Sequence, residues 1–337
     1  MALLEIRDLH VSFATRDGIV HAVDGVSLSV DRGRTLGVVG ESGSGKSVTA
    51  LTVMGLTRLP NATIEGHVLL DGVDLLALPG DELRRVRGKR VAMIFQDPLS
   101  SLHPLYKIGW QIEEAIRAHE RVSEKAARAR ALEALTEVGI PSPGDRLSSY
   151  PHELSGGMRQ RVMIAMALVL DPEILIADEP TTALDVTVQA QILDLMRALQ
   201  AEHGTAVLLI THDLGVIAET ADEVAVMYAG RVAELGALVG VLDAPEHPYT
   251  WGLLQSLPSA DASRDQPLHP IEGTPPSLIA VPSGCPFHPR CPYVMAVCPR
   301  EEPALLPTRP GHTVACHLPV PTRRRIGAAV RAPNARA

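Results

Sequence analysis

The sequence is poor in aromatic residues and has no hydrophobic run long enough to cross a membrane. Phe, Trp and Tyr make up 3% of the 337 residues, so a hydrophobic core must rely on Val, Leu, Ile, Ala and Met. The longest apolar run, residues 162–170, is far shorter than the roughly 20 residues of a membrane span and predicts a buried helix. Glu5, Arg7 and Asp8 lie too near the start for a secretory signal peptide. We therefore expect the chain to be cytosolic.

An excess of positive charge is also absent. The formal net charge is −8 and the isoelectric point is near 5.9, which argues against a protein that binds nucleic acid by neutralising its phosphates. The composition, 46% hydrophobic and 21% charged, is that of a globular protein. A chain of 337 residues is long enough for two or three units with a large core.

Cysteine and proline are scarce in the first 235 residues. All four cysteines lie after residue 280, and only nine of the 27 prolines lie before residue 236. This shift predicts a boundary between a first domain (1–235) and a loop-rich C-terminal extension (236–322). The last residues, 323–337, begin with three arginines and are rich in alanine, so we expect a flexible tail there.

Hydrophobic patterning in the first domain predicts an α/β fold. Residues 3–11 and 21–30 alternate like strands of an N-terminal antiparallel sheet, whereas 174–177 and 206–210 are continuous apolar runs, as in a parallel sheet buried on both faces. Further strands are predicted at 35–39, 63–71 and 90–95, and helices at 108–119, 123–138, 158–170, 187–201 and 213–220. The segment 97–165 is predicted to be a helical insertion into this core.

Residues 40–47 (GESGSGKS) match the phosphate-binding pattern G-x-x-x-x-G-K-[ST]. The pattern follows a predicted strand and precedes a helix-compatible run, which is the context that it requires. Glycines let backbone N–H groups approach an oxyanion, and a helix N-terminus adds partial positive charge. Lys46 would reach the β- and γ-phosphates, and the Ser47 hydroxyl would ligate Mg²⁺. The alternative is a flexible Gly/Ser loop.

Two further motifs follow the phosphate loop. An apolar strand ends in Asp178 and Glu179, which suit a Mg²⁺ shell and a general base that polarises water. Ser155 and two glycines precede the predicted helix 158–170 and would form a second anion site at its start. Taken alone, these motifs have ordinary alternatives: two acids that end a strand, and a serine N-cap. The phosphate loop upstream favours the chemical interpretation of the two carboxylates.

The ordered set 40–47, 154–157 (LSGG), 174–179 and 211–213 (THD) resembles an ABC-type ATPase subunit over residues 3 to about 235. The resemblance implies roles for further residues. Gln96 resembles the Q-loop glutamine that contacts Mg²⁺ and water, and His212 resembles the switch histidine at the γ-phosphate. Residues 183–185 resemble the D-loop at a subunit interface. Phe13 matches the aromatic residue that stacks on adenine; the alternative is a core residue of a strand.

The predicted site residues fall into three sets. The catalytic set is Glu179, His212 and Gln96. The ATP-binding set is Phe13, Gly40, Ser42, Gly43, Ser44, Gly45, Lys46, Ser47, Val48, Asp178, Ser155, Gly156, Gly157 and Asp185. The Mg²⁺ set is Ser47 and Gln96.

Residues 154–162 and 97–102 (DPLSSL) resemble, more narrowly, the ATPases of dipeptide/oligopeptide (peptide/nickel) importers. In that family two ATPase subunits pack head to tail, with ATP between the phosphate loop of one and the signature of the other. The resemblance implies two membrane permease subunits, a second ATPase subunit (a paralogue or a copy of this chain), an extracytoplasmic peptide-binding protein, and a peripheral location on the cytoplasmic face of the membrane.

Two other functions stay open. The first is the same role for nickel or another small solute. The second is a soluble ABC ATPase that acts on DNA or ribosomes. The acidic balance of the chain, its single ATPase core and its lack of a long coiled coil weigh against the second, and no nucleic-acid partner is expected.

The extension contains all four cysteines of the chain, which are Cys285, Cys291, Cys298 and Cys316. In a cytosolic chain, clustered thiols suggest a metal centre rather than disulfides. Four sulfurs suit Zn²⁺ or a [4Fe–4S] cluster; wide spacing and adjacent prolines favour the cluster, which the resemblance also implies for some relatives. Thiols without metal are the third alternative. His288, His312 and His317 are expected to be exposed side chains rather than ligands. We expect the extension to be structural and to leave the ATPase chemistry unaffected.

Overall fold

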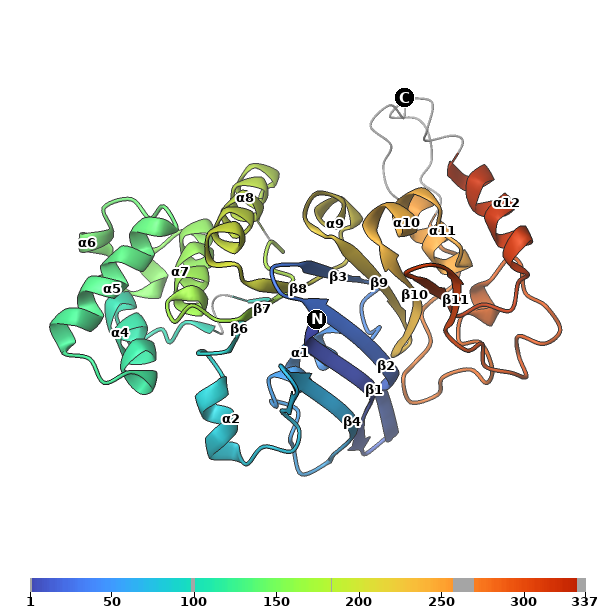
Figure 1. Ribbon diagram of the computed structural model, residues 1–337, viewed down its shortest axis with the longest axis horizontal. Helices are drawn as coiled ribbons and strands as arrows, with labels where there is room; N and C mark the ends of the chain where they lie inside the picture. Colours follow the sequence, from blue (N-terminus) through green and yellow to red (C-terminus); the bar gives the residue numbers. More distant parts are fainter. Residues whose placement is uncertain (1, 98–100, 183, 257–269, 332–337) are drawn as a thin grey trace. The chain divides into compact units, whose positions relative to one another are not determined.

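The computed structural model describes residues 2–97, 101–182, 184–256 and 270–331 (Figure 1). The chain divides into two compact units. Unit 1 comprises Met1–Leu4, Val30–Thr35 and Leu69–Ile210, and unit 2 comprises Glu5–Ser29, Leu36–Val68 and Thr211–Ala337. Within the described ranges, no helix combines the length and the apolar character that a membrane crossing requires.

Unit 1 is built on three parallel strands in the order β8-β7-β6. These strands are β6 (Val91–Ile94), β7 (Ile174–Asp178) and β8 (Ala206–Thr211). Every residue of β6 and β7 is buried, as expected of parallel strands that are covered on both faces. The long helix α8 (Val186–His203) ends at Gly204, which adopts a left-handed conformation that favours glycine.

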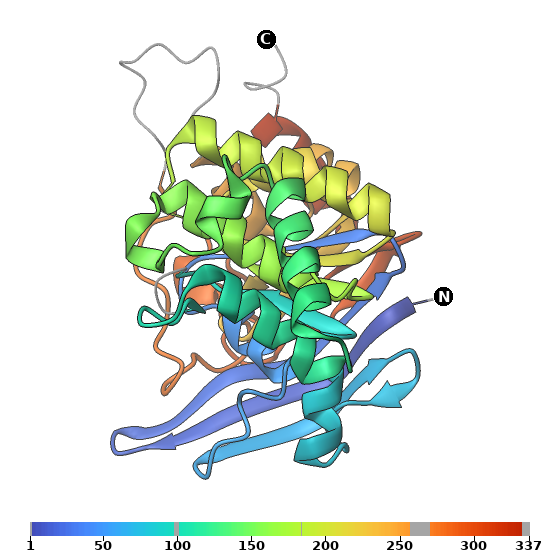
Figure 2. The same cartoon turned by 90° about the vertical axis from the view of Figure 1, so that its left-hand side faces the viewer.

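A helical subdomain follows β6 in unit 1. Its helices α4 (Ile108–His119), α5 (Glu124–Glu137) and α7 (Gly156–Leu168) pack against one another (Figure 2). Ile112 and Ile116 lie one turn apart on the inner face of α4, and neither is exposed to solvent. The unit also contains β5 (Val73–Asp74), α2 (Gly80–Val86), α6 (Pro143–Arg146) and the 3₁₀ turn η1 (Pro151–Glu153).

Unit 2 contains most of the N-terminal sheet, with strand order β2-β1-β4. The strands are β1 (Ala2–Thr15), β2 (Gly18–Asp31) and β4 (Ala62–Leu70). In β2 the side chains of Val26, Leu28 and Val30 are buried while the residues between them are exposed, which is the two-residue period of a half-buried strand.

A second sheet of unit 2 has the order β11-β12-β10-β9-β3. Its strands are β3 (Thr35–Val39), β9 (Glu223–Tyr228), β10 (Arg231–Ala237), β11 (Leu306–Arg309) and β12 (His312–Val314). Strand β3 is parallel to β9, and all other neighbours are antiparallel. Strands of the predicted extension therefore continue a sheet of the predicted first domain.

The remaining helices of unit 2 are α1 (Lys46–Val53), α9 (Leu214–Thr220), α10 (Leu238–Asp243), α11 (Pro248–Gln255), the 3₁₀ turn η2 (His288–Arg290) and α12 (Val320–Arg331). The prediction of a flexible tail from residue 323 is wrong as far as residue 331. Helix α12 contacts α11, and its Arg323 is 5% exposed. A side chain at Gly327 would come within 2.4 Å of the Pro245 carbonyl oxygen, so the small residue permits this close packing.

Candidate nucleotide-binding and catalytic site

The phosphate loop lies between β3 and α1 in unit 2 and owes its shape to three glycines. Gly40, Gly43 and Gly45 have φ values of +155°, +78° and +99°, which other residues rarely adopt. A Cβ at Gly40 would lie 2.2 Å from the Met227 carbonyl oxygen, and one at Gly45 would lie 2.4 Å from that of Ala22. The loop therefore tolerates no side chain at these two positions.

The side chain of Lys46 is folded into the loop. The residue is 5% exposed, and its ammonium group donates hydrogen bonds to the carbonyl oxygens of Gly40 (2.7 Å) and Glu41 (2.9 Å) and to Ser44 Oγ (3.2 Å). No side chain caps the N-terminus of α1, since Gly45 occupies the N-cap position. The loop thus combines a fixed positive charge with a helix start of the kind that binds anions.

The other predicted residues of the loop differ in their exposure to solvent. Ser42 and Gly43 are exposed, whereas Ser47 and Val48 at the first turn of α1 are partly exposed. Unit 2 also contains His212, whose side chain is exposed just before α9. Asp213 caps that helix by accepting the N–H of Gly215 at 2.7 Å. Phe13 lies on β1 with a partly exposed ring.

The carboxylates of the predicted strand end lie in unit 1. Asp178 is the last residue of β7 and is 5% exposed. Glu179 follows with φ +48°, a left-handed conformation that is strained for a residue with a side chain and is common at functional sites. Its N–H donates to the Ile210 carbonyl oxygen at 2.8 Å, so the neighbouring strand holds this conformation.

The structure brings Gln96 and Glu179 together. Gln96 Nε2 donates to Glu179 Oε2 at 2.8 Å, and Thr182 Oγ1 donates to the same oxygen at 3.0 Å. The carboxylate is thereby oriented by two neutral donors. This arrangement suits a general base that accepts a proton from water.

The signature motif and the D-loop segment are adjacent in unit 1. Ser155 is the N-cap of α7 and accepts the N–H of Met158 at 3.3 Å, while Asp185 caps α8 by accepting the N–H of Val188 at 3.0 Å. A Cβ at Gly157 would lie 2.9 Å from Val188 Cγ1, so α7 and α8 meet at that glycine. Ser155, Gly156 and Asp185 are exposed. Ala183 of the D-loop and residues 98–100 of the segment DPLSSL lie outside the described residues.

All four cysteines lie in unit 2. The N–H of Cys285 donates to the Cys298 carbonyl oxygen at 2.8 Å. Burial raises the pKa of Cys291 to about 11 and that of Cys316 to about 12. These buried surroundings favour the neutral thiol at Cys291 and Cys316.

This arrangement does not fit a bound metal as the side chains stand. Among the described residues, no three His, Cys, Asp or Glu side chains form a group that could hold a metal ion. The prediction of a [4Fe–4S] cluster, with Zn²⁺ as its alternative, therefore finds no support in the geometry.

The expectation for the nearby histidines is also partly wrong. His312 is 2% exposed, and its Nε2 donates to Glu234 Oε1 at 2.8 Å. His317 forms a hydrogen bond between its Nε2 and the Glu301 carbonyl oxygen at 2.8 Å. His312 is thus a buried structural residue rather than a surface side chain.

Sequence reasoning missed a contact between the phosphate loop and the extension. Arg290 of the extension pairs with Glu41, the second residue of the loop. A carboxylate within an anion-binding loop was a signal that a partner is needed, but no pattern in the sequence indicates which of its arginines supplies it.

Two family profiles match the chain. The profile described as "ABC transporter" matches residues 23–182, and the one described as "Oligopeptide/dipeptide transporter, C-terminal region" matches residues 233–298. The dipeptide transport ATP-binding protein DppD of Bacillus subtilis is 51% identical over 317 residues, which cover 94% of each chain. The oligopeptide transport ATP-binding protein OppD of Bacillus subtilis is 50% identical over 325 residues, 96% of this chain and 91% of that protein.

Solved structures agree on the fold. The dimeric structure of MJ0796, a bacterial ABC transporter cassette, has a TM-score of 0.63 and 30% identity and covers 70% of this chain and 98% of its own. These matches and the α/β architecture define an ABC-type ATPase, as predicted. The chain belongs to the dipeptide/oligopeptide transporter family of ABC transporter ATP-binding subunits. Permease partners in a membrane follow from membership of that family.

Proposed function

We propose that this chain hydrolyses ATP to drive the import of di- or oligopeptides through a membrane ABC transporter. The extension is the observation that supports peptides as the cargo, because residues 233–298 match the C-terminal region of oligopeptide/dipeptide transporters. The names of the relatives from Bacillus subtilis, at 51% and 50% identity, point to the same cargo.

The chemistry is assigned to the residues described above. Lys46 and the N–H groups of the loop bind the phosphates, and Glu179, oriented by Gln96, accepts the proton of the attacking water. Ser47, Gln96 and the buried Asp178 would hold Mg²⁺, since hydroxyl, amide and carboxylate oxygens suit this ion. The ion would neutralise charge on the phosphates. His212 is assigned to the γ-phosphate and Phe13 to adenine.

The catalytic form is proposed to be a head-to-tail pair of ATPase subunits. Ser155, Gly156 and Asp185 are exposed, and the uncapped helix start of α1 belongs to the other unit of the chain. Exposure of the signature supports its use by a second subunit, either a paralogue or a copy of this chain. ATP would then join the two subunits, and hydrolysis would release them.

The permease contact is proposed to lie next to α4. Leu105, Tyr106 and Trp110 are 78%, 45% and 49% exposed, and the rings of Tyr106 and Trp110 stack at 4.2 Å between centroids. Large apolar side chains on a surface are typical of protein interfaces. This contact would hold the chain peripherally on the cytoplasmic face of the membrane, with an extracytoplasmic binding protein that selects the cargo.

Uptake measurements test the cargo. A strain that lacks the gene is complemented with the wild-type chain or with Glu179→Gln as a matched inactive control. We expect wild type alone to restore the uptake of radiolabelled di- and tripeptides, with nickel uptake equal in all strains. Restoration of nickel uptake instead would favour the small-solute alternative. Unchanged uptake of both would favour a role outside transport.

The cofactor prediction also included a metal centre, a [4Fe–4S] cluster or Zn²⁺, at the four cysteines. The grouping of all four cysteines within residues 285–316 supports a metal there, whereas no three potential ligands among the described residues form a group that could hold one. Analysis of iron, acid-labile sulfide and zinc in protein purified without oxygen decides between the alternatives. About four iron and four sulfide per chain would indicate the cluster, and one zinc per chain would indicate Zn²⁺. Neither metal would leave structural thiols.

A further inference from the structure

Glu41 places a negative charge inside the loop that is assigned to the phosphates. The loop attracts anions through its backbone N–H groups and Lys46. A carboxylate at its second position would repel the same phosphates unless an opposite charge neutralised it. The structure shows that this neutralising charge comes from the C-terminal extension.

Arg290 forms a bidentate ion pair with Glu41 through its two terminal nitrogens. Nη1 donates to Glu41 Oε2 at 2.6 Å and Nη2 donates to Oε1 at 3.1 Å. The remaining donors bond the carbonyl oxygens of Glu272 (2.9 Å) and Ile271 (3.3 Å) and the hydroxyl of Tyr228 (3.4 Å). All five N–H donors of the arginine are therefore used, in the forked geometry that lysine cannot reproduce.

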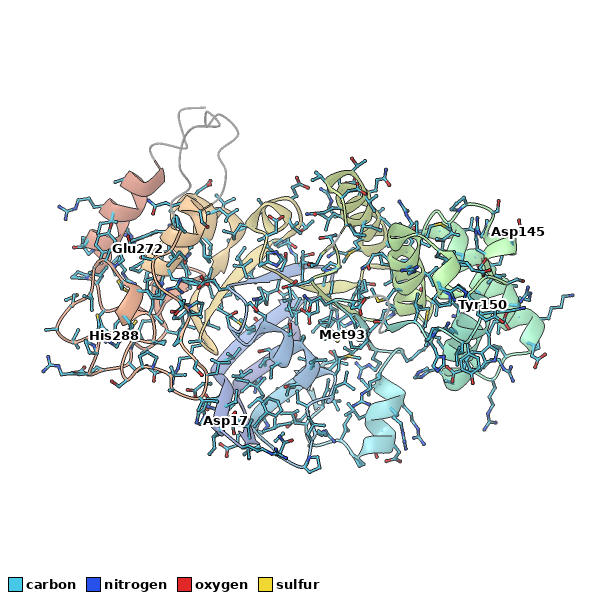
Figure 3. The ribbon with its side chains drawn as sticks, turned by 180° about the vertical axis from the view of Figure 1, so that it is seen from behind. Asp17, Met93, Asp145, Tyr150, Glu272 and His288 are labelled. Atoms are coloured by element: carbon cyan, nitrogen blue, oxygen red, sulfur yellow. The ribbon has the colours of Figure 1, made fainter. Side chains whose placement is uncertain are left out.

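The pair is shielded from water. The side chain of Arg290 is 5% exposed and that of Glu41 is 27% exposed. Burial opposes the charge of Arg290, but hydrogen bonds and the charge of Glu41 outweigh it and raise the pKa of the guanidinium group. Figure 3 labels Glu272 and His288, which lie in the two segments of the extension that contain Arg290 and its carbonyl partners.

The backbone of Glu41 is held as firmly as its side chain. Its N–H donates to the Tyr249 hydroxyl at 2.8 Å, and its carbonyl oxygen accepts from Lys46 Nζ at 2.9 Å. Tyr249 is the second residue of α11 and is completely buried. One residue of the phosphate loop is thus fixed at three points, two of which belong to the extension.

An aromatic cluster supports these contacts. The ring of Tyr228 lies 4.6 Å from that of Tyr249 and 5.2 Å from that of Phe287, and the Arg290 guanidinium lies 5.8 Å from the Tyr228 ring. The chain has only three phenylalanines and five tyrosines. Three of these eight rings meet beneath this pair, which makes the position of Arg290 rigid.

We propose that Arg290 and Tyr249 are positioning residues for nucleotide binding, through which the C-terminal extension neutralises Glu41 and sets the shape of the phosphate loop. The proposal rests on the assignment of residues 40–47 to the phosphates of ATP. The extension is then a part of the nucleotide site, contrary to our expectation that it leaves the ATPase chemistry unaffected.

Binding of a fluorescent ATP analogue with Mg²⁺ to the full-length chain tests the proposal. Arg290→Met leaves the Glu41 carboxylate without its partner, and we expect about a tenfold to hundredfold rise in Kd, the usual range for a charge-assisted contact. Glu41→Gln combined with Arg290→Met removes the unpaired charge and should restore most of the affinity. Arg290→Lys retains the charge but not the two parallel bonds to Glu41, so its Kd should rise less, by about twofold to tenfold.

Two controls separate the possible failures. Arg309→Met removes another arginine of the extension, which donates to the carbonyl oxygens of Gly240 and Ala244, both at 2.8 Å, and it should not change Kd. Lys46→Ala should abolish binding. Normal binding by Lys46→Ala would overturn the assignment of the loop itself, and with it the proposal.

The proposal alone is overturned if Lys46→Ala loses binding while Arg290→Met binds within twofold of wild type. It is also overturned if Arg290→Met and Arg309→Met lose affinity equally and Glu41→Gln restores neither, because the loss then reflects the stability of the extension. Melting temperatures identify any variant that fails to fold. If Arg290→Met fails to fold, Arg290→Lys decides: it keeps the charge without the two parallel bonds, so a Kd equal to that of wild type contradicts the proposal.

Discussion

Replacement of Glu234 should unfold the C-terminal extension more readily than any surface change. This carboxylate on β10 is completely buried and joins three segments. Its Oε1 accepts from the N–H of Glu246 (2.7 Å) and from His312 Nε2 (2.8 Å), and Oε2 accepts from the N–H of His247 (3.0 Å). Because Arg309 donates to His312 Nδ1 at 3.2 Å, the proton of the ring lies on Nε2 and faces the carboxylate.

The size of the effect follows from these bonds. Glu234→Ala leaves three buried donors without an acceptor, at a cost of about 1–3 kcal/mol each if unrelieved. Water that enters the space would offset part of the loss, so we expect the free energy of unfolding to fall by about 3–5 kcal/mol, as for other broken buried pairs. Glu234→Gln retains one acceptor oxygen but turns an NH₂ group toward a donor, and should cost about 1–3 kcal/mol.

Tryptophan fluorescence during urea unfolding measures this loss of free energy of unfolding in the extension itself. The chain has two tryptophans, Trp110 in α4 and Trp251 in α11. Trp251 is 2% exposed, and its Nε1 donates to the Pro245 carbonyl oxygen at 2.9 Å, next to the segment that Glu234 holds. Trp110→Phe therefore gives a background in which the fluorescence reports the extension alone.

The matched control is Asp194→Ala, which removes an exposed carboxylate from its pair with Arg197 and should cost less than about 0.5 kcal/mol. A loss of less than about 1 kcal/mol for Glu234→Ala would refute the reasoning, because one buried donor without a partner already costs that much. Equal effects of the Gln and Ala replacements would show that the hydrogen bonds to the carboxylate are not the cause.

Three further predictions each concern one side chain. Glu179→Gln keeps an oxygen for the Gln96 hydrogen bond, so it should bind ATP within about threefold of wild type, hydrolyse it about 10²–10⁴ times more slowly and accumulate as a closed dimer in gel filtration; ordinary turnover would exclude Glu179 as the base. Burial lowers the pKa of His247 from 6.5 to about 3, so the neutral ring stabilises the fold fully above pH 6.5, and this stability is lost as the pH falls toward 3. His247→Asn can still cap α11 and should weaken the fall in the free energy of unfolding, followed by Trp251 fluorescence, between pH 6.5 and 3; an unchanged pH dependence would contradict this. In metal-free protein at pH 8, a pKa raised from 9.0 to about 11 leaves Cys291 about 100 times less thiolate than in the unfolded chain, so iodoacetamide should label it about 100 times more slowly, and equal rates in native and urea-unfolded protein would refute the shift.

Local patterns in the sequence were sufficient for the regular elements of the ATPase core. The apolar run 174–177 became the buried strand β7, and the repeat of isoleucine in 108–119 became α4. The glycines of residues 40–47 implied a tight loop, and Gly40 and Gly45 occupy positions where any Cβ would meet a backbone oxygen. These features depend on side chains within one or two turns of each other, so their signals are local.

Composition was misleading in the extension. Residues 323–331 read as a frayed tail because arginine and alanine supply little apolar surface, yet α12 forms there and Arg323 is 5% exposed. His312 read as a surface residue, although it lies buried against Glu234. In both cases contacts with distant segments replaced the local hydrophobic signal, so composition alone could not reveal the outcome.

The sequence by itself determined the chemistry that the chain can perform: a loop for phosphates, a carboxylate after a buried strand, and the order of motifs that identifies the ATPase. The tertiary structure alone decided that the extension contacts this machinery, because Arg290 and Glu41 lie 249 positions apart and meet only through the pairing of strands and the packing of aromatic rings. A contact of that span depends on which surfaces remain adjacent after the core has formed, and no periodic pattern along the chain encodes it.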